Sequence, residues 1–338
     1  NTAIGREALE ANTTASNNTA VGMHSLTTNT TGTNNNALGY QGLNSNTTGN
    51  YNIAIGNAAL YANTTASNNT AVGYASLLAN TTGADNSGTG YKALAANTTG
   101  AYNTALGSHA LRTNTTASYN AAVGYQSLYL NTTGTRLTAI GYESLKANTT
   151  GSYNVAIGRS ALTANTTGTY NTAVGALALD ANTTASYNTA MGYYALSSET
   201  LGARNVAIGH ETLASQNFTS ATDSYNTAVG MAAGRLVTTG VNNTFIGGNA
   251  GTANTTGVQN VAVGAGALDA NTTANNNVAV GYNALSASTT ASNNVAIGQK
   301  ALILTTTGAN NIAVGKDSLQ TNTTGANNVG VGYQALNV

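Results

Sequence analysis

The chain has 338 residues, of which only 6% are charged, and its formal net charge is zero. It therefore lacks the clusters of Lys and Arg that mark proteins that bind nucleic acids or anionic membrane surfaces. No apolar run is long enough for membrane insertion, and the absence of Cys excludes disulfides and thiolate metal sites.

A glycine that follows an aliphatic residue in nearly every copy recurs every 17 residues along the chain. The series begins with Gly5, Gly22, Gly39, Gly56 and Gly73, which we assign as structural corners. The unit reads N-T-A-V-G-Y-x-A-L-x-A-N-T-T-G-x-N/Y, and we number its positions 1 to 17. Twenty copies predict a single repeat domain, 1–338, with regular coils over 1–204, a four-residue insertion within 205–225, variant coils over 226–259 and regular coils over 260–338.

The first segment of each unit, N-T-A-V-G, alternates as a strand does, and its Gly, Asn and β-branched residues disfavour a helix. Position 4 is aliphatic in all copies but one, so we expect it to face the inside of the coil. Alanine at position 3, such as Ala20 or Ala54, would then form a flat outer face that suits another chain. A second short strand is predicted for A-L-x-A, with Leu at position 9 and Ala at position 11 inside. The N-T-T-G segment would turn the chain back, with Gly supplying a positive φ.

One such coil cannot fold alone. Burying one Val and one Leu contributes roughly 3–6 kcal/mol, whereas ordering 17 residues costs at least about 17 kcal/mol of backbone entropy. We therefore expect an all-β fold, a parallel β-solenoid or β-roll of twenty 17-residue coils, on the order of 95 Å long, with an Asn ladder at position 1. Because the core of each coil is thin, we also predict a homotrimer with the Ala faces toward its axis.

The unit at Asn154–Ala164, N-V-A-I-G-R-S-A-L-T-A, resembles the head repeats of trimeric autotransporter adhesins. That resemblance implies a left-handed parallel β-roll that forms trimers, although the N-T-T-G corner makes this repeat longer. The run N-T-A-V-G-Y-x-A-L-x-x-N-T-T-G is similar to repeats of phage tail-fibre proteins, and Asn243–Gly251 looks like a variant of it. The second resemblance implies a fibre on a virion.

Two irregularities interrupt the pattern. The insertion lies within Ser215–Tyr225, and we interpret it as a bulged corner loop, with a receptor-contacting loop as the alternative. In the next two copies Gly234 and Gly251 replace the core Leu, and Phe245 replaces the small Ala at position 3. We expect Phe245 to fill space between chains beside a locally thinned core.

No catalytic, cofactor-binding or metal-binding constellation is expected, so the chain is not predicted to be an enzyme. The three histidines, His24, His109 and His210, lie in coils far apart, and the ten carboxylates are scattered. Tyrosines gather at positions 6 and 17, where they could shield strand edges or contact sugar rings.

The N-T-T corner matches the acceptor motif for N-glycosylation, although a turn also needs Asn and Thr for its own backbone bonds. The candidate glycosylation sites are Asn12, Asn29, Asn46, Asn63, Asn80, Asn97, Asn114, Asn131, Asn148, Asn165, Asn182, Asn217, Asn254, Asn271 and Asn322.

The function expected from the sequence is structural, namely the rigid shaft of an extracellular fibre on a virion or cell surface. The alternatives are an adhesin whose side binds cell-surface glycans, a glycosylated cell-surface filament built end to end from copies of this chain, and, with less support, an ice-binding protein with Thr columns. The expected partners are the chain itself, as a homotrimer or an end-to-end filament, and cell-surface glycans, with no nucleic acid and no membrane insertion.

Overall fold

The computed structural model describes residues 1–337, so Val338, the last residue of the predicted domain, lies outside the described part. The chain forms an all-β parallel β-solenoid of about 19 coils with about 17 residues per turn, and no helix occurs within residues 1–337. This confirms the predicted fold class. The coils fall into two units, Asn1–Thr169 and Tyr170–Val338, each of which repeats the same architecture.

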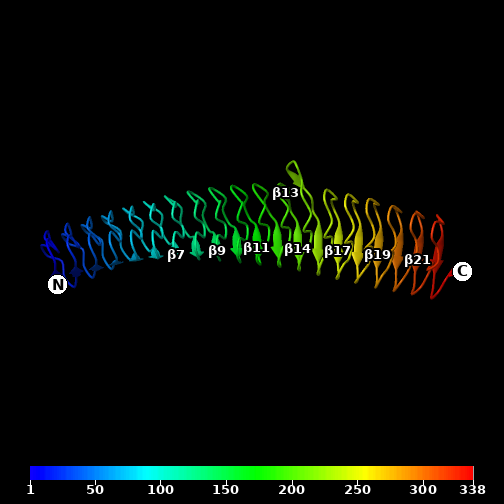
Figure 1. Ribbon diagram of the computed structural model, residues 1–338, viewed down its shortest axis with the longest axis horizontal. Helices are drawn as coiled ribbons and strands as arrows, with labels where there is room; N and C mark the ends of the chain where they lie inside the picture. Colours follow the sequence, from blue (N-terminus) through cyan, green and yellow to red (C-terminus); the bar gives the residue numbers. More distant parts are fainter. Residues whose placement is uncertain (338) are drawn as a thin grey trace. The chain divides into compact units, whose positions relative to one another are not determined.

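In the first unit each coil contributes one three-residue strand to a parallel sheet, and successive strands lie side by side (Figure 1). These strands are β1 (Thr2–Ile4), β2 (Thr19–Val21), β3 (Asn36–Leu38), β4 (Ile53–Ile55), β5 (Thr70–Val72), β6 (Ser87–Thr89), β7 (Thr104–Leu106), β8 (Ala121–Val123), β9 (Thr138–Ile140) and β10 (Val155–Ile157). The register is constant, so that Ala3 pairs with Ala20 and Ala37 with Ala54.

The second unit repeats this sheet and adds a small two-stranded one. The main strands are β11 (Thr172–Val174), β12 (Thr189–Met191), β14 (Val206–Ile208), β16 (Thr227–Val229), β17 (Thr244–Ile246), β18 (Val261–Val263), β19 (Val278–Val280), β20 (Val295–Ile297), β21 (Ile312–Val314) and β22 (Val329–Val331). The small sheet pairs β13 (Gly202–Ala203) with β15 (Thr222–Asp223). Strand β15 lies in the insertion, whose loop stands out from the neighbouring coils in Figure 1, and β13 lies in the coil before it.

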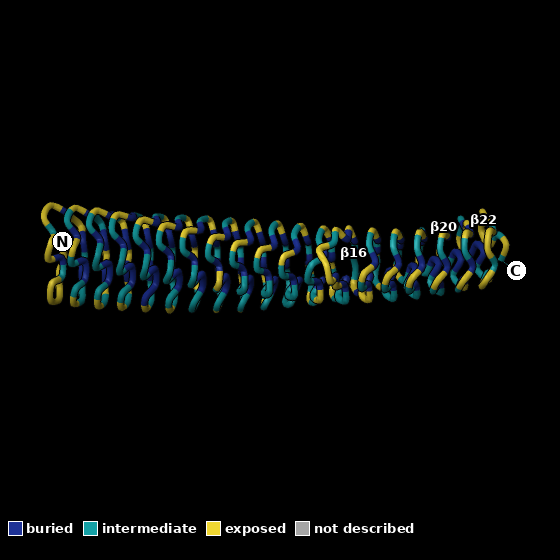
Figure 2. The backbone as a smooth tube through the Cα atoms, turned by 90° about the horizontal axis from the view of Figure 1, so that it is seen from above, coloured by how far each residue is buried: buried dark blue, intermediate teal, exposed yellow. Residues whose placement is uncertain are grey.

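The prediction of which strand face lies inside the coil is wrong. Alanine at position 3 is buried, with Ala20 and Ala54 both 0% exposed, whereas Ile4 and Ile55 at position 4 are 60% and 40% exposed. Figure 2 shows the buried residues as a continuous inner side of the coils in each unit. Alternation fixes that positions 3 and 4 face opposite sides, but it does not say which side is inside.

The small space left beside the side chain at position 9 explains why position 3, and not position 4, lies inside the coil. Leu at position 9 fills the interior, and the two copies that carry Gly at position 3 show how little room is left. A Cβ on Gly88 would lie 2.7 Å from Ser76 Oγ and 3.4 Å from Leu77 Cγ. At Gly88 even one added carbon would crowd Ser76, so the interior space at position 3 is no larger than the methyl group that Ala supplies in most other coils, and Val or Ile would exceed it.

The predicted second strand is also wrong, because positions 6 to 11 form a series of turns. Positions 7 and 9 are left-handed, as in Gln41 (φ 57) and Leu43 (φ 52), and a strand cannot continue through such residues. The chain still bonds to the next coil here, since the Leu43 amide donates to the Ala59 carbonyl at 2.9 Å. Position 9 points inward as expected, but its inward neighbour is position 8 rather than Ala at position 11.

The glycine at position 5 follows each strand in a conformation that requires glycine. Gly39 has φ +138, and a Cβ there would lie 2.5 Å from the Gly56 carbonyl oxygen of the next coil. At the other corner the glycine of N-T-T-G is not left-handed, contrary to expectation. Position 17, for example Asn34 (φ 59), takes that conformation instead.

Two asparagine ladders join the coils. At position 1, as predicted, the backbone N–H of Asn35 donates to Asn18 Oδ1 at 2.9 Å. The side-chain Nδ2 of Asn35 donates to the Gly49 carbonyl at 2.8 Å. At position 12 a second ladder appears, in which Asn46 Nδ2 donates to Asn29 Oδ1 at 2.8 Å and to the same Gly49 carbonyl at 3.0 Å. The first ladder closes each coil on itself, and both connect it to the next coil.

Candidate functional site

Most of the candidate glycosylation sites lie inside the coils. Twelve of the fifteen acceptor asparagines are 0% exposed, because they form the ladder at position 12. Their Nδ2 atoms are the ladder donors, as in the bonds of Asn97 to Asn80 Oδ1 (2.8 Å) and to the Gly100 carbonyl (2.9 Å). A glycan at Nδ2 is incompatible with these contacts in the folded coil. These twelve are Asn29, Asn46, Asn63, Asn80, Asn97, Asn114, Asn131, Asn148, Asn165, Asn182, Asn254 and Asn271.

The other three acceptor asparagines are more accessible. Asn12 and Asn322 are half-buried and lie in coils near the two ends of the described chain. Asn217 is exposed and belongs to the insertion, where its Oδ1 accepts a hydrogen bond from Thr200 Oγ1 at 2.8 Å. Of the fifteen, Asn217 is the one that is fully on the exposed surface, and it lies on the insertion.

The three histidines do not converge, as the sequence indicated. His24 contacts Glu7 Oε2 at 2.7 Å, and His210 stacks on Tyr193 with ring centroids 5.5 Å apart. Burial lowers the pKa of His109, and the nearby charges of Arg112 and Lys92 lower it further. Within residues 1–337 no group of three His, Asp or Glu side chains lies close enough to hold a metal ion.

Phe245 lies inside its own coil, so the expected role between chains is wrong. Its side chain is 0% exposed. A Cβ on Gly234 would lie 2.8 Å from the Phe245 ring, and one on Gly251 would lie 2.5 Å from it. The ring therefore occupies the interior space that Leu fills in the other coils, and the core is repacked rather than thinned.

Beside the insertion, Glu199 and Gln216 replace two asparagines of the position-12 ladder and hold the loop by hydrogen bonds. Glu199 stands where Asn is usual, and its carboxylate accepts the amides of Leu201 (3.0 Å) and Gly202 (2.5 Å). Gln216, the next residue of the column, donates Nε2 to Glu199 Oε2 at 2.8 Å, and Phe218 is buried beside it. These contacts fix the start of the loop to the coil interior.

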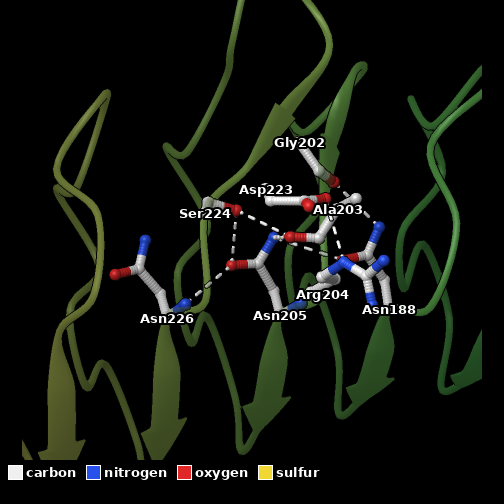
Figure 3. Close-up of polar contacts among 8 residues, drawn as sticks. All are labelled: Asn188, Gly202, Ala203, Arg204, Asn205, Asp223, Ser224 and Asn226. Carbon is white, nitrogen blue, oxygen red and sulfur yellow. Dashed lines mark hydrogen bonds and ion pairs between the residues drawn. The ribbon is translucent and has the colours of Figure 1, made fainter.

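The end of the loop joins the position-1 ladder, which continues across the four extra residues (Figure 3). Asn205 Oδ1 accepts hydrogen bonds from the backbone N–H of Asn226 at 3.2 Å and from Ser224 Oγ at 2.8 Å. Beside this network Arg204 Nε lies 3.0 Å from Asp223 Oδ1. The hydrogen bond to Asp223, followed by its charge, raises the pKa of Arg204.

Arg204 belongs to an exposed column of aromatic and cationic side chains at position 17. In the first unit Tyr102 stacks on Tyr119 at 5.1 Å, and the Arg136 guanidinium lies 5.5 Å from the Tyr119 ring and 5.3 Å from that of Tyr153. The tyrosines of this column are expected from the sequence, whereas the arginine that continues their stack is not.

The second unit carries the same Tyr-Tyr-Arg-Tyr arrangement. Tyr170 stacks on Tyr187 at 5.2 Å, and the Arg204 guanidinium lies 4.9 Å from the Tyr187 ring and 5.8 Å from that of Tyr225. These tyrosines are about half exposed. Each arrangement is therefore an exposed patch, on its own unit, of phenol edges around one guanidinium group.

The backbone does not account for tyrosine at position 17. The position is left-handed, with φ 58 at Tyr102 and φ 64 at Tyr187, and most other copies place Asn there. Asn adopts this conformation readily, whereas bulkier side chains cost roughly 1–2 kcal/mol each. The departure from Asn, the commonest residue at position 17, is the signal in the sequence that could have identified this column.

An open cavity of about 420 Å³ adjoins the column at the insertion. Tyr187, Arg204 and Asp223 line one part of it, and Leu201 and Ala221 are among its apolar walls. The volume is that of a small-ligand site. A second open cavity of about 520 Å³ lies over the turn segments of the same region, beside the Glu211–Arg235 ion pair.

No known protein family and no curated protein matches this sequence. Within residues 1–337 no helix is long and apolar enough to cross a membrane.

Proposed function

We propose that the chain is the rigid structural shaft of an extracellular fibre, on a virion or a cell surface, that holds other parts of the fibre apart. The observation that supports this function most directly is the double asparagine ladder. Most coils are bonded to the next through strand amides, turn amides and two buried side-chain columns. Bending between coils would break several of these bonds at once, which favours stiffness.

The shaft also presents a surface for association with copies of itself. Positions 2 and 4 of every strand face outward, and aliphatic side chains such as Leu106, Ile140 and Ile157 are between about one third and one half exposed. An exposed apolar strip of this kind marks an interaction surface. Since alanine at position 3 is interior, we place the inter-chain contact of the proposed homotrimer on this opposite face.

Light scattering coupled to gel filtration tests the association. We expect the full chain to elute with three times its chain mass, and the double variant Ile140→Thr/Ile157→Thr to dissociate more readily on dilution. Thr89 shows that the strand accommodates Thr at position 4. The matched control is Leu130→Thr, an exposed aliphatic residue in a turn segment away from the strand face.

Electron microscopy of the same sample tests the shaft. Straight particles of uniform length, close to the length of about 95 Å expected for twenty stacked coils, would support the proposal. Particles that bend at many points, or a chain that stays monomeric at high concentration, would contradict stiffness and association respectively.

A further inference from the structure

We propose that the cavity at the insertion binds a neutral saccharide, with Arg204 and Asp223 as its hydrogen-bonding groups. This inference goes beyond the shaft function and does not depend on it. It rests on the cavity of about 420 Å³ and on the ion pair that borders it. The position of these groups beside the loop is shown in Figure 3.

The insertion creates this cavity. The backbone pairing of β13 with β15 places Asp223 next to Ala203, one residue before Arg204. Asp223 thereby reaches the guanidinium at 3.0 Å, although the two residues are 19 positions apart. The regular coils contain no counterpart of β15, so they cannot bring a carboxylate from a loop to the position-17 column.

The lining is amphipathic in the way a pyranose ring is. Leu201, Ala203 and Ala221 provide apolar contacts suited to the C–H face of a sugar. Arg204 and Asp223 offer planar groups that bind pairs of adjacent hydroxyls, the guanidinium as donor and the carboxylate as acceptor. Thr184 and Thr222 add hydroxyl groups at the rim.

The charge balance favours a neutral saccharide over an acidic one. The guanidinium of Arg204 is matched by the carboxylate of Asp223, and the chain has no net charge. An anionic ligand would have to displace Asp223 from the ion pair, whereas a neutral sugar can bond to both groups while they stay in contact.

Tyr187 presents the edge of its ring, and not a face, to the cavity. Its two faces are covered by Tyr170 at 5.2 Å and by the Arg204 guanidinium at 4.9 Å. The same contacts hold the guanidinium in a fixed orientation toward the cavity, because its plane is restrained by an aromatic ring and by a carboxylate. Such a preorganised group loses little freedom when a ligand binds.

The experiment uses the full chain on an array of neutral hexose and N-acetylhexosamine oligosaccharides, printed together with their sialylated and sulfated forms. We expect at least one neutral oligosaccharide to be retained. Arg204→Asn and Asp223→Asn should each weaken its binding about tenfold or more, since each removes charge-assisted hydrogen bonds to sugar hydroxyls. Asn is the usual residue at position 17, so Arg204→Asn preserves the backbone conformation.

The matched control is Tyr102→Asn, which makes a similar change in the column of the first unit, away from this cavity. It should leave affinity within about twofold. Tyr187→Asn provides an additional variant if Arg204→Asn alters the circular dichroism spectrum. Binding confined to acidic oligosaccharides, no binding of any neutral one, or equal affinity of the wild type and all three cavity variants would overturn the proposal. Electron microscopy of the same samples reports on the shaft independently.

Discussion

The ring of Phe245 fills the interior space that the two glycines at position 9 leave empty, so its removal should destabilise these coils. Phe245→Ala restores the residue usual at position 3, but it leaves the interior beside Gly234 and Gly251 empty. Truncation of a buried Phe costs about 3–5 kcal/mol. We therefore expect the coils over 226–259 to lose most of their local stability.

The reciprocal change should rescue the variant. Gly251→Leu alone is expected to destabilise the fold, because its Cβ would lie 2.5 Å from the Phe245 ring. Combined with Phe245→Ala it recreates the Ala and Leu pair of the regular coils. Leu in the left-handed conformation, φ +58 here, costs roughly 1–2 kcal/mol relative to Gly. The double variant should accordingly recover a large part of the loss, but not all of it.

Local hydrogen exchange is the suitable assay, because stacked repeats need not unfold in one step and a single melting temperature would average over all coils. Amides of 226–259 should exchange faster in Phe245→Ala and be protected again in the double variant. Amides of 18–153 serve as the internal reference. Unchanged protection in Phe245→Ala, or a double variant no more protected than Phe245→Ala, would refute this account of the core.

Three further predictions concern the ladder, the glycine corner and one carboxylate. Asn97→Ala removes a buried amide from the position-12 ladder and should cost about 1–3 kcal/mol per unsatisfied partner, measured as faster exchange in the adjoining coils. Gly107→Ala should destabilise strongly, because φ is +141 and the Cβ would lie 2.5 Å from the next carbonyl oxygen. Its control, Gly42→Ala, should be tolerated, since the nearest atom is 3.7 Å away. Burial raises the pKa of Asp269, so the carboxylate costs stability once the pH rises above its unfolded value. Amides of the coil that holds Asp269 should therefore exchange more slowly in Asp269→Asn than in the wild type at neutral pH, and the difference should vanish below about pH 4; equal exchange of the two proteins at both pH values would contradict this.

Periodicity alone determined much of this protein. A repeat of 17 residues that is too thin to fold singly requires stacking, and stacking in constant register aligns identical residues. That argument predicts the parallel solenoid, the Asn column at position 1, the inward Leu at position 9 and the place of the insertion. It holds because each step depends on spacing and composition, which are read directly from the chain.

Only the tertiary structure decided which strand face lies inside and how the remaining segments run. Hydrophobicity favours Val and Ile for the interior, yet the volume left by Leu77 and its equivalents admits only Ala. The A-L-x-A segment reads as a strand, but left-handed residues at positions 7 and 9 turn it around the Leu. The burial of the position-12 asparagines likewise depends on contacts between coils, which no local motif encodes.

The cavity at the insertion is likewise predictable from the sequence only in part. The sequence marks the insertion and the tyrosines at position 17, because both depart from the repeat. It does not show that Asp223 meets Arg204, because that contact depends on how β15 pairs with β13. Spacing along the chain fixes the register of the regular coils, whereas an irregular loop is positioned by its own hydrogen bonds and packing.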